Sequence, residues 1–204
     1  MEDLKWLFFD MGSTLIDESK VYEDIYRKIA ETAKVSYDQV CQKALEYYQQ
    51  NKKGDIEVAK LFGVERPRWN PGLEVLYDDT KRILQILSER YRIGIIANQM
   101  LGSEERLMNF GIREYLDLIV ASAEEGVQKP DKRIFEIALE RAGCTADQAM
   151  MIGDRIDNDI VPAKELGFKT AWIKQGPGQC WHISGEREIP DHEVHNLSEL
   201  LTIL

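Results

Sequence analysis

Two aspartates of the sequence lie at the ends of short apolar runs. Asp10 comes directly after the run at 6–9, and Asp154 follows the run at 149–152 with Gly153 between. If both runs are neighbouring strands of a parallel sheet, their carboxyl ends meet at one edge, where such sheets bind ligands. The two carboxylates then converge, and two close anions require a cation between them. Because oxygen ligands select a hard ion, we expect this cation to be Mg²⁺.

The elements that must position these aspartates are strands buried on both faces. Five runs lack the polar alternation of a half-exposed strand, which indicates a parallel sheet covered by helices. They lie at 6–9, 93–97, 118–120, 149–152 and 170–173, and His192–Val194 is a candidate edge strand. Helical spacing of apolar residues at 79–91, 131–142 and 158–166 separates them. This alternation predicts an α/β fold with a doubly wound, Rossmann-like parallel sheet.

The interval after the first run breaks this alternation. Three successive segments, 21–32, 37–50 and 56–61, have helical patterns. A helical insertion at this point of an α/β sheet lies over the carboxyl ends of the strands, where it closes the site. We therefore expect a core domain of residues 1–16 and 78–204 and a small all-helical cap domain of residues 17–77.

The charge and the cysteines narrow the choice of partners and compartment. The formal net charge is −10, and an acidic surface repels nucleic acid and anionic membranes, so we expect neither as a partner. The three cysteines are scattered along the chain, which fits a reducing cytosol. No basic segment precedes the first, short apolar run, so we expect a cytoplasmic protein. A phosphorylated substrate would require cations at the site itself.

Four short motifs follow one another along the chain, each after its own predicted strand. The motifs are Asp10 to Thr14, Ala97 with Asn98, Lys129 with Pro130, and Gly153 with Asp154 and Asp159. Their order resembles the haloacid dehalogenase superfamily, in the branch with a helical cap after the first strand. The resemblance covers nearly the whole chain, and it implies a magnesium-dependent phosphatase that acts on a small phosphorylated metabolite.

The resemblance implies a role for each matching residue. Asp10 would be the nucleophile and would form an aspartyl phosphate. The Mg²⁺ ion would be held by Asp10, by Asp154 and by the backbone carbonyl of Gly12. Lys129 would neutralise phosphoryl oxygens as a compact positive charge. Asp159, with Asn158, would lie behind the metal ligands and hold Lys129 or a metal-bound water. The phosphoryl group would lie against Met11, Gly12, Ala97, Asn98 and Lys129.

Two positions depart from the pattern of the family's phosphatases. Gly12 stands where these enzymes usually carry a second aspartate, whose acid–base help is commonly worth about 10²–10⁴-fold. Ala97 stands where a serine or threonine usually donates to the phosphoryl group, a loss worth about 2.7–4 kcal/mol. Asn98 is a partial substitute for that donor. Asp17 and Glu18 are alternative acids, although the start of the first cap helix is the favoured role for both.

Three functions therefore stay open from the sequence. The first is the phosphatase that acts through Asp10, and the second is a weakened or non-catalytic binder of metal and phosphate. The third is the dehalogenase or phosphonate-cleaving chemistry of family branches that also lack the second aspartate. The physiological substrate and the oligomeric state are left open as well.

The polar residues of the cap also allow two interpretations. In the family the cap sets the specificity, but a linear pattern does not position its side chains. The tyrosine pair at 47–48 is more typical of packing than of ligand contact. A second group of residues is compatible with either substrate contact or solvent exposure: Lys52, Lys53, Arg66, Arg68 and Trp69.

Overall fold

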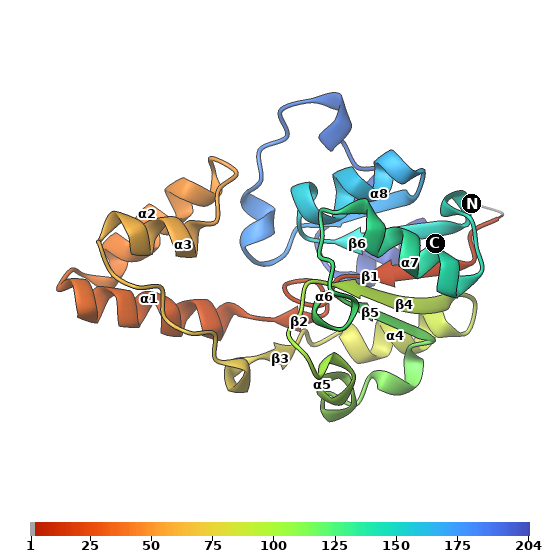
Figure 1. The fold of residues 1–204 in the computed structure, drawn as a ribbon, viewed down its shortest axis with the longest axis horizontal. Coiled ribbons are helices and arrows are strands. Elements are labelled where there is room, and N and C mark those ends of the chain that lie inside the picture. The colour runs from red at the N-terminus through yellow and green to blue at the C-terminus, as the bar shows by residue number, and fades with distance from the viewer. Residues whose placement is uncertain (1–2) are drawn as a thin grey trace.

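The main element of the protein is a six-stranded parallel sheet, seen in a computed structural model that describes residues 3–204. The strand order is β5-β4-β1-β6-β7-β8, so β1 lies between β4 and β6 (Figure 1). Each predicted strand is present, including the edge strand. The strands are β1 (Trp6–Phe9), β4 (Arg92–Ala97), β5 (Leu118–Ala121), β6 (Ala149–Gly153), β7 (Lys169–Ile173) and β8 (His192–Val194).

Helices cover both faces of this sheet, which explains the continuous apolar runs. Leu7 and Phe9 of β1 pack on one face with α4, α5 and α9, while Phe8 packs on the other with α7 and α8. The predicted doubly wound α/β core is thus confirmed. No helix within residues 3–204 has the length and apolarity needed to cross a membrane. The core helices are α4 (Thr80–Ser88), α5 (Ser103–Asn109), α6 (Ser122–Glu125), α7 (Lys132–Ala142), α8 (Val161–Leu166) and α9 (Leu200–Ile203).

The segment after β6 differs from the single helix predicted at 158–166. A widened π-helical turn, Ile156–Ile160, precedes α8, and Pro162 lies in the first turn of α8, where its missing N–H costs nothing. The Arg155 carbonyl accepts hydrogen bonds from the N–H groups of both Asp159 and Ile160. This wide turn places Asp159 beside the end of β6.

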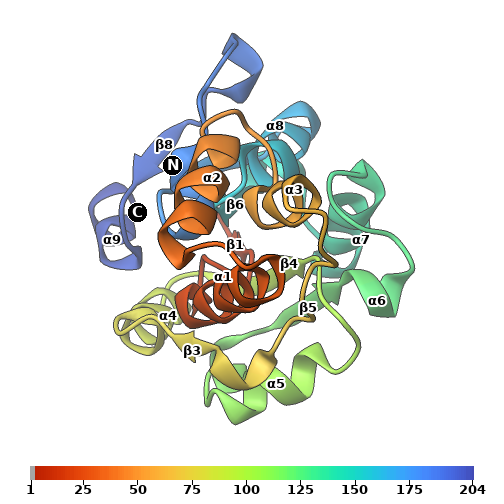
Figure 2. The same cartoon turned by 90° about the vertical axis from the view of Figure 1, so that its left-hand side faces the viewer.

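Three helices between β2 and β3 form a separate unit, which we call the cap. They are α1 (Ser19–Ala33), α2 (Tyr37–Tyr48) and α3 (Gly54–Leu61), close to the predicted segments. Apolar residues of all three helices pack into a core of their own, distinct from the two beside the sheet. Figure 2 looks onto the cap, with β1, β4 and β6 behind it. The cap therefore covers the carboxyl ends of the central strands.

The chain passes between the sheet and the cap twice, and the two passages pair with each other. β2 (Ile16–Asp17) and β3 (Val75–Leu76) form a short antiparallel ladder. The domain boundaries predicted after residue 16 and before residue 78 lie in or next to this ladder, and the division itself stays a prediction. A further contact comes from Asn51, whose amide exchanges two hydrogen bonds of 2.8 Å with the backbone of His182.

Candidate active site

The ends of β1 and β6 bring three carboxylates together. Phe9 is paired with Ile152, and the Asp10 N–H donates to the Ile152 carbonyl at 2.9 Å, so the ladder continues to the first residue after β1. One carboxylate oxygen from each of Asp10, Asp154 and Asp159 lies within 4.8 Å of the others. The main-chain pairing of β1 with β6 therefore fixes the positions of Asp10 and Asp154 relative to each other.

Asp159 reaches this cluster because Gly153 leaves room for it. A Cβ added at Gly153 would lie 2.6 Å from the Cβ of Asp159, closer than real Cβ atoms approach. The Asp159 carboxylate is fully buried, and the Arg155 N–H donates to its Oδ2 at 3.0 Å. Burial raises the pKa of Asp159 to about 6, although the nearby Lys129 acts in the opposite direction. The acid is therefore held by its neighbours and has no access to solvent.

Lys129 provides the positive charge of the cluster. Its Nζ lies 2.8 Å from Asp10 Oδ1 and 2.6 Å from Asp159 Oδ1, and it donates to the Ile96 carbonyl at 2.9 Å. Asn98 holds this lysine from behind, since its Oδ1 accepts from the Lys129 N–H and its Nδ2 donates to the Lys129 carbonyl. Burial lowers the pKa of Lys129, but the two carboxylates outweigh it and raise the pKa overall, so the lysine is charged.

The charges of the cluster leave a deficit that suits a divalent cation. When ionised, the three carboxylates and Lys129 sum to two negative charges. Burial raises the pKa of Asp154 well above its ordinary value, and Asp10 and Asp159 add to that shift. No group of residues 3–204 donates a hydrogen bond to the Asp154 carboxylate, although the side chain is buried. An oxygen-only donor set with this charge fits a hard divalent ion.

The loop after Asp10 turns tightly and brings a fourth carboxyl group to the site. Ser13 has a φ of 55°, and its hydroxyl donates to Glu18 Oε2 at 3.0 Å. Glu18 is buried, which raises the pKa of its carboxyl to about 8; the Ser13 hydrogen bond lowers the pKa, and Asp10 raises it further. Asp17, by contrast, accepts a hydrogen bond from the Ser19 N–H at the start of α1.

Glu18 lies at the start of the cap helix, as the sequence favoured, but its side chain takes no part in capping that helix. Glu18 occupies the N-cap position of α1, but its carboxyl makes no capping hydrogen bond. The carboxyl instead turns back toward the loop that follows Asp10, where Ser13 binds it. Only Asp17 of the two acids bonds to the helix start.

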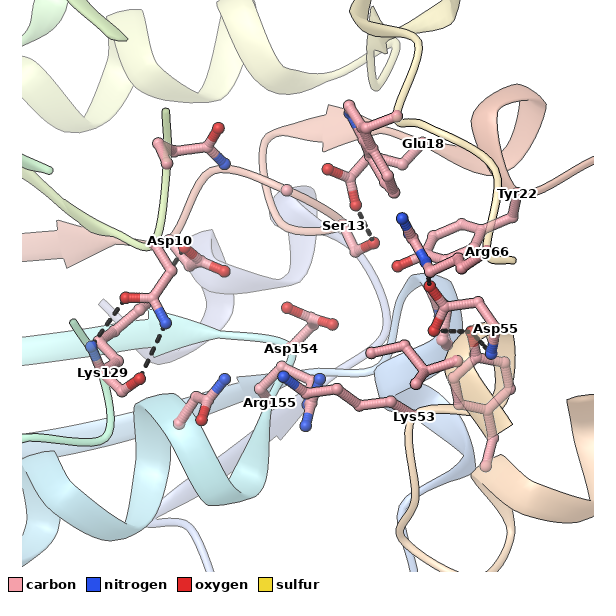
Figure 3. A pocket seen from close by; sticks show the side chains of 18 of the residues that line it. Asp10, Ser13, Glu18, Tyr22, Lys53, Asp55, Arg66, Lys129, Asp154 and Arg155 are labelled. Atoms are coloured by element: carbon pink, nitrogen blue, oxygen red, sulfur yellow. Dashed lines mark hydrogen bonds and ion pairs between the residues drawn. The ribbon is translucent and has the colours of Figure 1, made fainter. Parts of the chain in front are cut away.

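A cavity of about 370 Å³ lies between the strand ends and the cap (Figure 3). We call its core side the floor, formed by Asp10, Lys129 and Asp154 with Asp159 buried behind them, and its cap side the roof, formed by Tyr48, Lys53, Asp55, Arg66 and Trp69. On the roof, Arg66 Nε lies 2.6 Å from Asp55 Oδ2, and Asp55 also accepts from the Tyr48 hydroxyl at 3.4 Å. Arg155, whose guanidinium is paired with Asp157, lines the cavity between the two sides.

The remaining residues singled out from the sequence divide into two groups. Asn98, Gly12 and Asn158 line the cavity. Ala97 and the side chain of Met11 are buried in the apolar core, so neither offers a polar side-chain group to a ligand. On the roof, Lys53, Arg66 and Trp69 line the cavity, and so does Tyr48, for which packing was expected.

Several lining residues were missed by the sequence reasoning. Asp55 begins a cap helix and has an unremarkable sequence context. Tyr22 lies on α1 at ordinary helical spacing. Arg155 directly follows Asp154 in the fourth motif, and this neighbourhood is the sequence feature that could have indicated its place at the cavity.

The comparisons with known proteins bear on this geometry. A family model described as a haloacid dehalogenase-like hydrolase matches residues 4–167. The chain belongs to this family. It is therefore a hydrolase by family, with a fold and motif order that agree with the resemblance drawn from the sequence.

Curated relatives and a solved structure extend this comparison. The chain is 27% identical over 227 residues to a glyceraldehyde 3-phosphate phosphatase of Pyrococcus furiosus, covering 100% of this chain and 94% of the relative. It is 34% identical over 128 residues to a pyrimidine 5'-nucleotidase of Escherichia coli, covering 58% of this chain and 53% of that protein. A putative HAD-hydrolase from Bacillus subtilis, solved bound to magnesium, has a TM-score of 0.70 at 21% identity, with 98% of each chain covered. This last similarity concerns the fold.

Proposed function

We propose that the protein is a magnesium-dependent phosphatase that acts on a small phosphorylated metabolite through an aspartyl phosphate at Asp10. The observation that carries this proposal is the floor, where Asp10 lies with Asp154, Asp159 and Lys129 around one point. A nucleophilic carboxylate, a site for a divalent cation and a buried lysine are the components that phosphoryl transfer requires. The names of the curated relatives, phosphatases of small metabolites, support the same reading.

Mg²⁺ would be held by Asp10, Asp154 and the carbonyl of Gly12. When bound, it would offset negative charge on the phosphoryl oxygens and orient the phosphorus toward Asp10. Asp159 would remain behind the ligands as the partner of Lys129, with Asn158 close to it. The magnesium reported for the Bacillus subtilis protein of the same fold supports the choice of ion.

The chain's own residues would carry two displacements at phosphorus. In the first, a carboxylate oxygen of Asp10 forms a bond to phosphorus while the ester P–O bond breaks, and the leaving oxygen takes up a proton. In the second, water attacks the same phosphorus, the P–O bond to Asp10 breaks, and phosphate leaves with Asp10 restored as a carboxylate. Lys129 and the loop N–H groups of Met11 and Gly12 would stabilise the phosphoryl oxygens, because donors aimed at developing charge lower the barrier.

Phosphate contacts beyond the loop would come from the end of β4. Ala97 is buried in the apolar core and provides no hydroxyl where the family's phosphatases usually have one. Asn98 lines the cavity and gives one amide hydrogen to the Lys129 carbonyl, which leaves its second amide hydrogen for a phosphoryl oxygen. Asn98 would thus serve both Lys129 and the substrate.

The roof would select the organic part of the substrate. The cavity suits a compact metabolite, and the roof presents both signs of charge through Lys53, Asp55 and Arg66. A small substrate with polar groups beyond its phosphate matches this lining better than a purely apolar one.

The proposal is tested by the hydrolysis of an aryl phosphate with and without Mg²⁺, in the wild type and in Asp10→Asn. We expect turnover only with the metal, and a loss of at least about 10⁴-fold in the variant, as for removal of other nucleophilic groups. Asp157→Asn is a matched control, because this acid is paired with Arg155 and is no part of the floor. Turnover that survives in Asp10→Asn would contradict the assignment of the nucleophile.

The dehalogenase chemistry left open by the sequence is tested separately, by halide release with and without Mg²⁺. That reaction needs no metal and releases halide from a 2-haloacid. The donor set of the floor favours the phosphatase, since three converging carboxylates would repel a carboxylate substrate in the absence of a cation. Halide release that is independent of Mg²⁺ would reverse this preference.

A further inference from the structure

The space that a side chain at residue 12 would fill is occupied by Glu18. A Cβ added at Gly12 would lie 2.8 Å from Glu18 Cδ and 2.9 Å from its Oε2, and Glu18 supplies all three of the nearest atoms. The Glu18 carboxyl can therefore occupy this place only because residue 12 has no side chain. A carboxyl group is present at this place of the site, but it comes from a different position of the chain.

The Glu18 carboxyl is held in this place. Glu18 is only 9% exposed, and the Ser13 hydroxyl fixes one carboxyl oxygen at 3.0 Å. The side chain lines the same cavity as Asp10 and Asp154, and Figure 3 shows it facing that cavity from the β2–α1 side. Asp17, the neighbouring acid, lies outside this cavity and bonds to the start of α1. Of the two adjacent acids, only Glu18 is in a position to reach a substrate bound at Asp10.

We propose that Glu18 is the general acid and base of the reaction and takes the place of a side chain at residue 12. This inference rests on the proposed phosphatase function and deepens it. Glu18 follows β2 directly and precedes α1, so the acid reaches the site from the passage that joins the cap to the core.

Glu18 would take part in one proton transfer in each displacement. As Asp10 attacks phosphorus and the ester P–O bond breaks, the Glu18 carboxylic acid gives its proton to the leaving oxygen, and a neutral alcohol departs. The Glu18 carboxylate then takes a proton from the attacking water as the new P–O bond forms and the P–O bond to Asp10 breaks. Phosphate leaves, Asp10 is a carboxylate again, and Glu18 has recovered its proton.

The test compares leaving groups, because a general acid matters for a poor leaving group and hardly at all for a good one. We would measure kcat/KM, which reports the first displacement, for an alkyl phosphate and for dinitrophenyl phosphate. In Glu18→Gln the ratio of the alkyl to the aryl value should fall by about 10²-fold or more. In the control Asp17→Asn the ratio should stay that of the wild type. Equal losses for both substrates in Glu18→Gln, or no loss for either, would overturn the inference.

A relocation experiment tests the same idea by recovery. The double variant Gly12→Asp with Glu18→Ala moves the carboxyl group to residue 12 and removes the side chain that blocks it. We expect its alkyl-to-aryl ratio to exceed that of Glu18→Ala alone by about tenfold or more. Gly12→Asp alone should lose activity on both substrates, because the two side chains compete for one space. If the double variant had the same alkyl-to-aryl ratio as Glu18→Ala, a carboxyl group at residue 12 would not replace that of Glu18, which would contradict the inference.

These outcomes separate the inference from the function on which it rests. Wild-type protein that hydrolyses both phosphates, and loses both in Asp10→Asn, supports the phosphatase whatever Glu18 does. A wild type that turns over neither substrate would overturn the phosphatase and the role of Glu18 together. A normal phosphatase whose leaving-group ratio ignores Glu18 would overturn the inference alone.

Discussion

The floor and the roof of the cavity are built in different ways. Asp10 and Asp154 follow strands of the parallel sheet, Lys129 bonds to one through the Ile96 carbonyl, and Asp159 is bonded to Lys129 and to the Arg155 N–H behind them. Roof residues lie on α2, on α3 and on the segments before and after α3, and Tyr48, Asp55, Arg66 and Trp69 are held by contacts with one another. The floor is therefore positioned by the main chain of the core, and the roof by side-chain contacts within the cap.

This difference indicates a division of labour. Chemistry at phosphorus requires groups placed to within a fraction of an ångström, which a buried sheet edge provides. Recognition of the organic group tolerates change, and cap helices with their own small core can vary without disturbing the sheet. We therefore expect floor variants to act on the rate constant and on stability, and roof variants to act on KM.

The largest contrast should come from the same substitution on each side. Among the described residues, Lys129→Met removes the only cation within hydrogen-bonding distance of the floor carboxylates and leaves buried Asp159 with the Arg155 N–H but without its ion-pair partner. We expect kcat to fall by about 10²–10³-fold and the protein to lose about 3–5 kcal/mol of stability. Lys53→Met, in the exposed roof lysine, should change KM several-fold with stability nearly unchanged. Steady-state kinetics and urea unfolding of both variants provide the comparison; similar losses of kcat would erase the proposed division.

Removal of the metal should affect the floor alone. With Mg²⁺ at about a hundred times its Kd, the folded state gains about 2.7 kcal/mol, which raises Tm by several degrees. Calorimetry with and without chelator should show this shift in the wild type and in Lys53→Met. In Asp154→Asn the shift should disappear, because one of the oxygen ligands is lost. A magnesium-dependent Tm in Asp154→Asn would place the ion elsewhere.

The same contrast explains what the sequence predicted and what it did not. Apolar runs that end in Asp10 and Asp154 predicted neighbouring strand ends, because a parallel sheet leaves little freedom there. The sequence placed Glu18 at the start of α1, which the structure confirms, but it did not predict that the side chain turns back to Ser13. That choice between two directions depends on the space beside Gly12, which is a tertiary property. Asp55 was missed because its role depends on Arg66 and Tyr48 folding against it.

Glu18 lies between the floor and the roof, because it precedes the first cap helix and its side chain lines the cavity. Its folded-state pKa of about 8 lies above the ordinary value, so its protonated form is favoured by folding. Its stabilising contribution is complete below pH 4.5 and is lost as the pH rises toward 8. Glu18→Gln, which cannot ionise, should therefore gain stability relative to the wild type between pH 5 and pH 8.

This measurement uses urea unfolding of both proteins in chelator at several pH values. Burial is the main cause of the raised pKa of Glu18, the Ser13 hydrogen bond lowers that pKa, and the charges of Asp10, Glu74 and Arg106 act on it as well. Asp17→Asn is again the control and should give a pH profile parallel to that of the wild type. A parallel profile for Glu18→Gln would mean that its carboxyl is hydrated and ionised in the folded protein.

The smallest expected effect concerns how the roof is held over the floor. Asn51 has a φ of 60° and bonds through its amide to both backbone groups of His182, in the segment between β7 and β8. Asn51→Gly keeps this backbone conformation and removes both hydrogen bonds, which are exposed to water and so worth about 0.5 kcal/mol each, or about 1 kcal/mol together. We expect KM to rise by at most about fivefold with kcat little changed, because the closed cap becomes less populated and the floor is untouched. Lys52→Ala is the control, since the contacts recorded for this lysine, with Gln50 and Tyr47, lie within the cap. If both variants raised KM equally, contacts inside the cap and not its attachment to the core would govern binding.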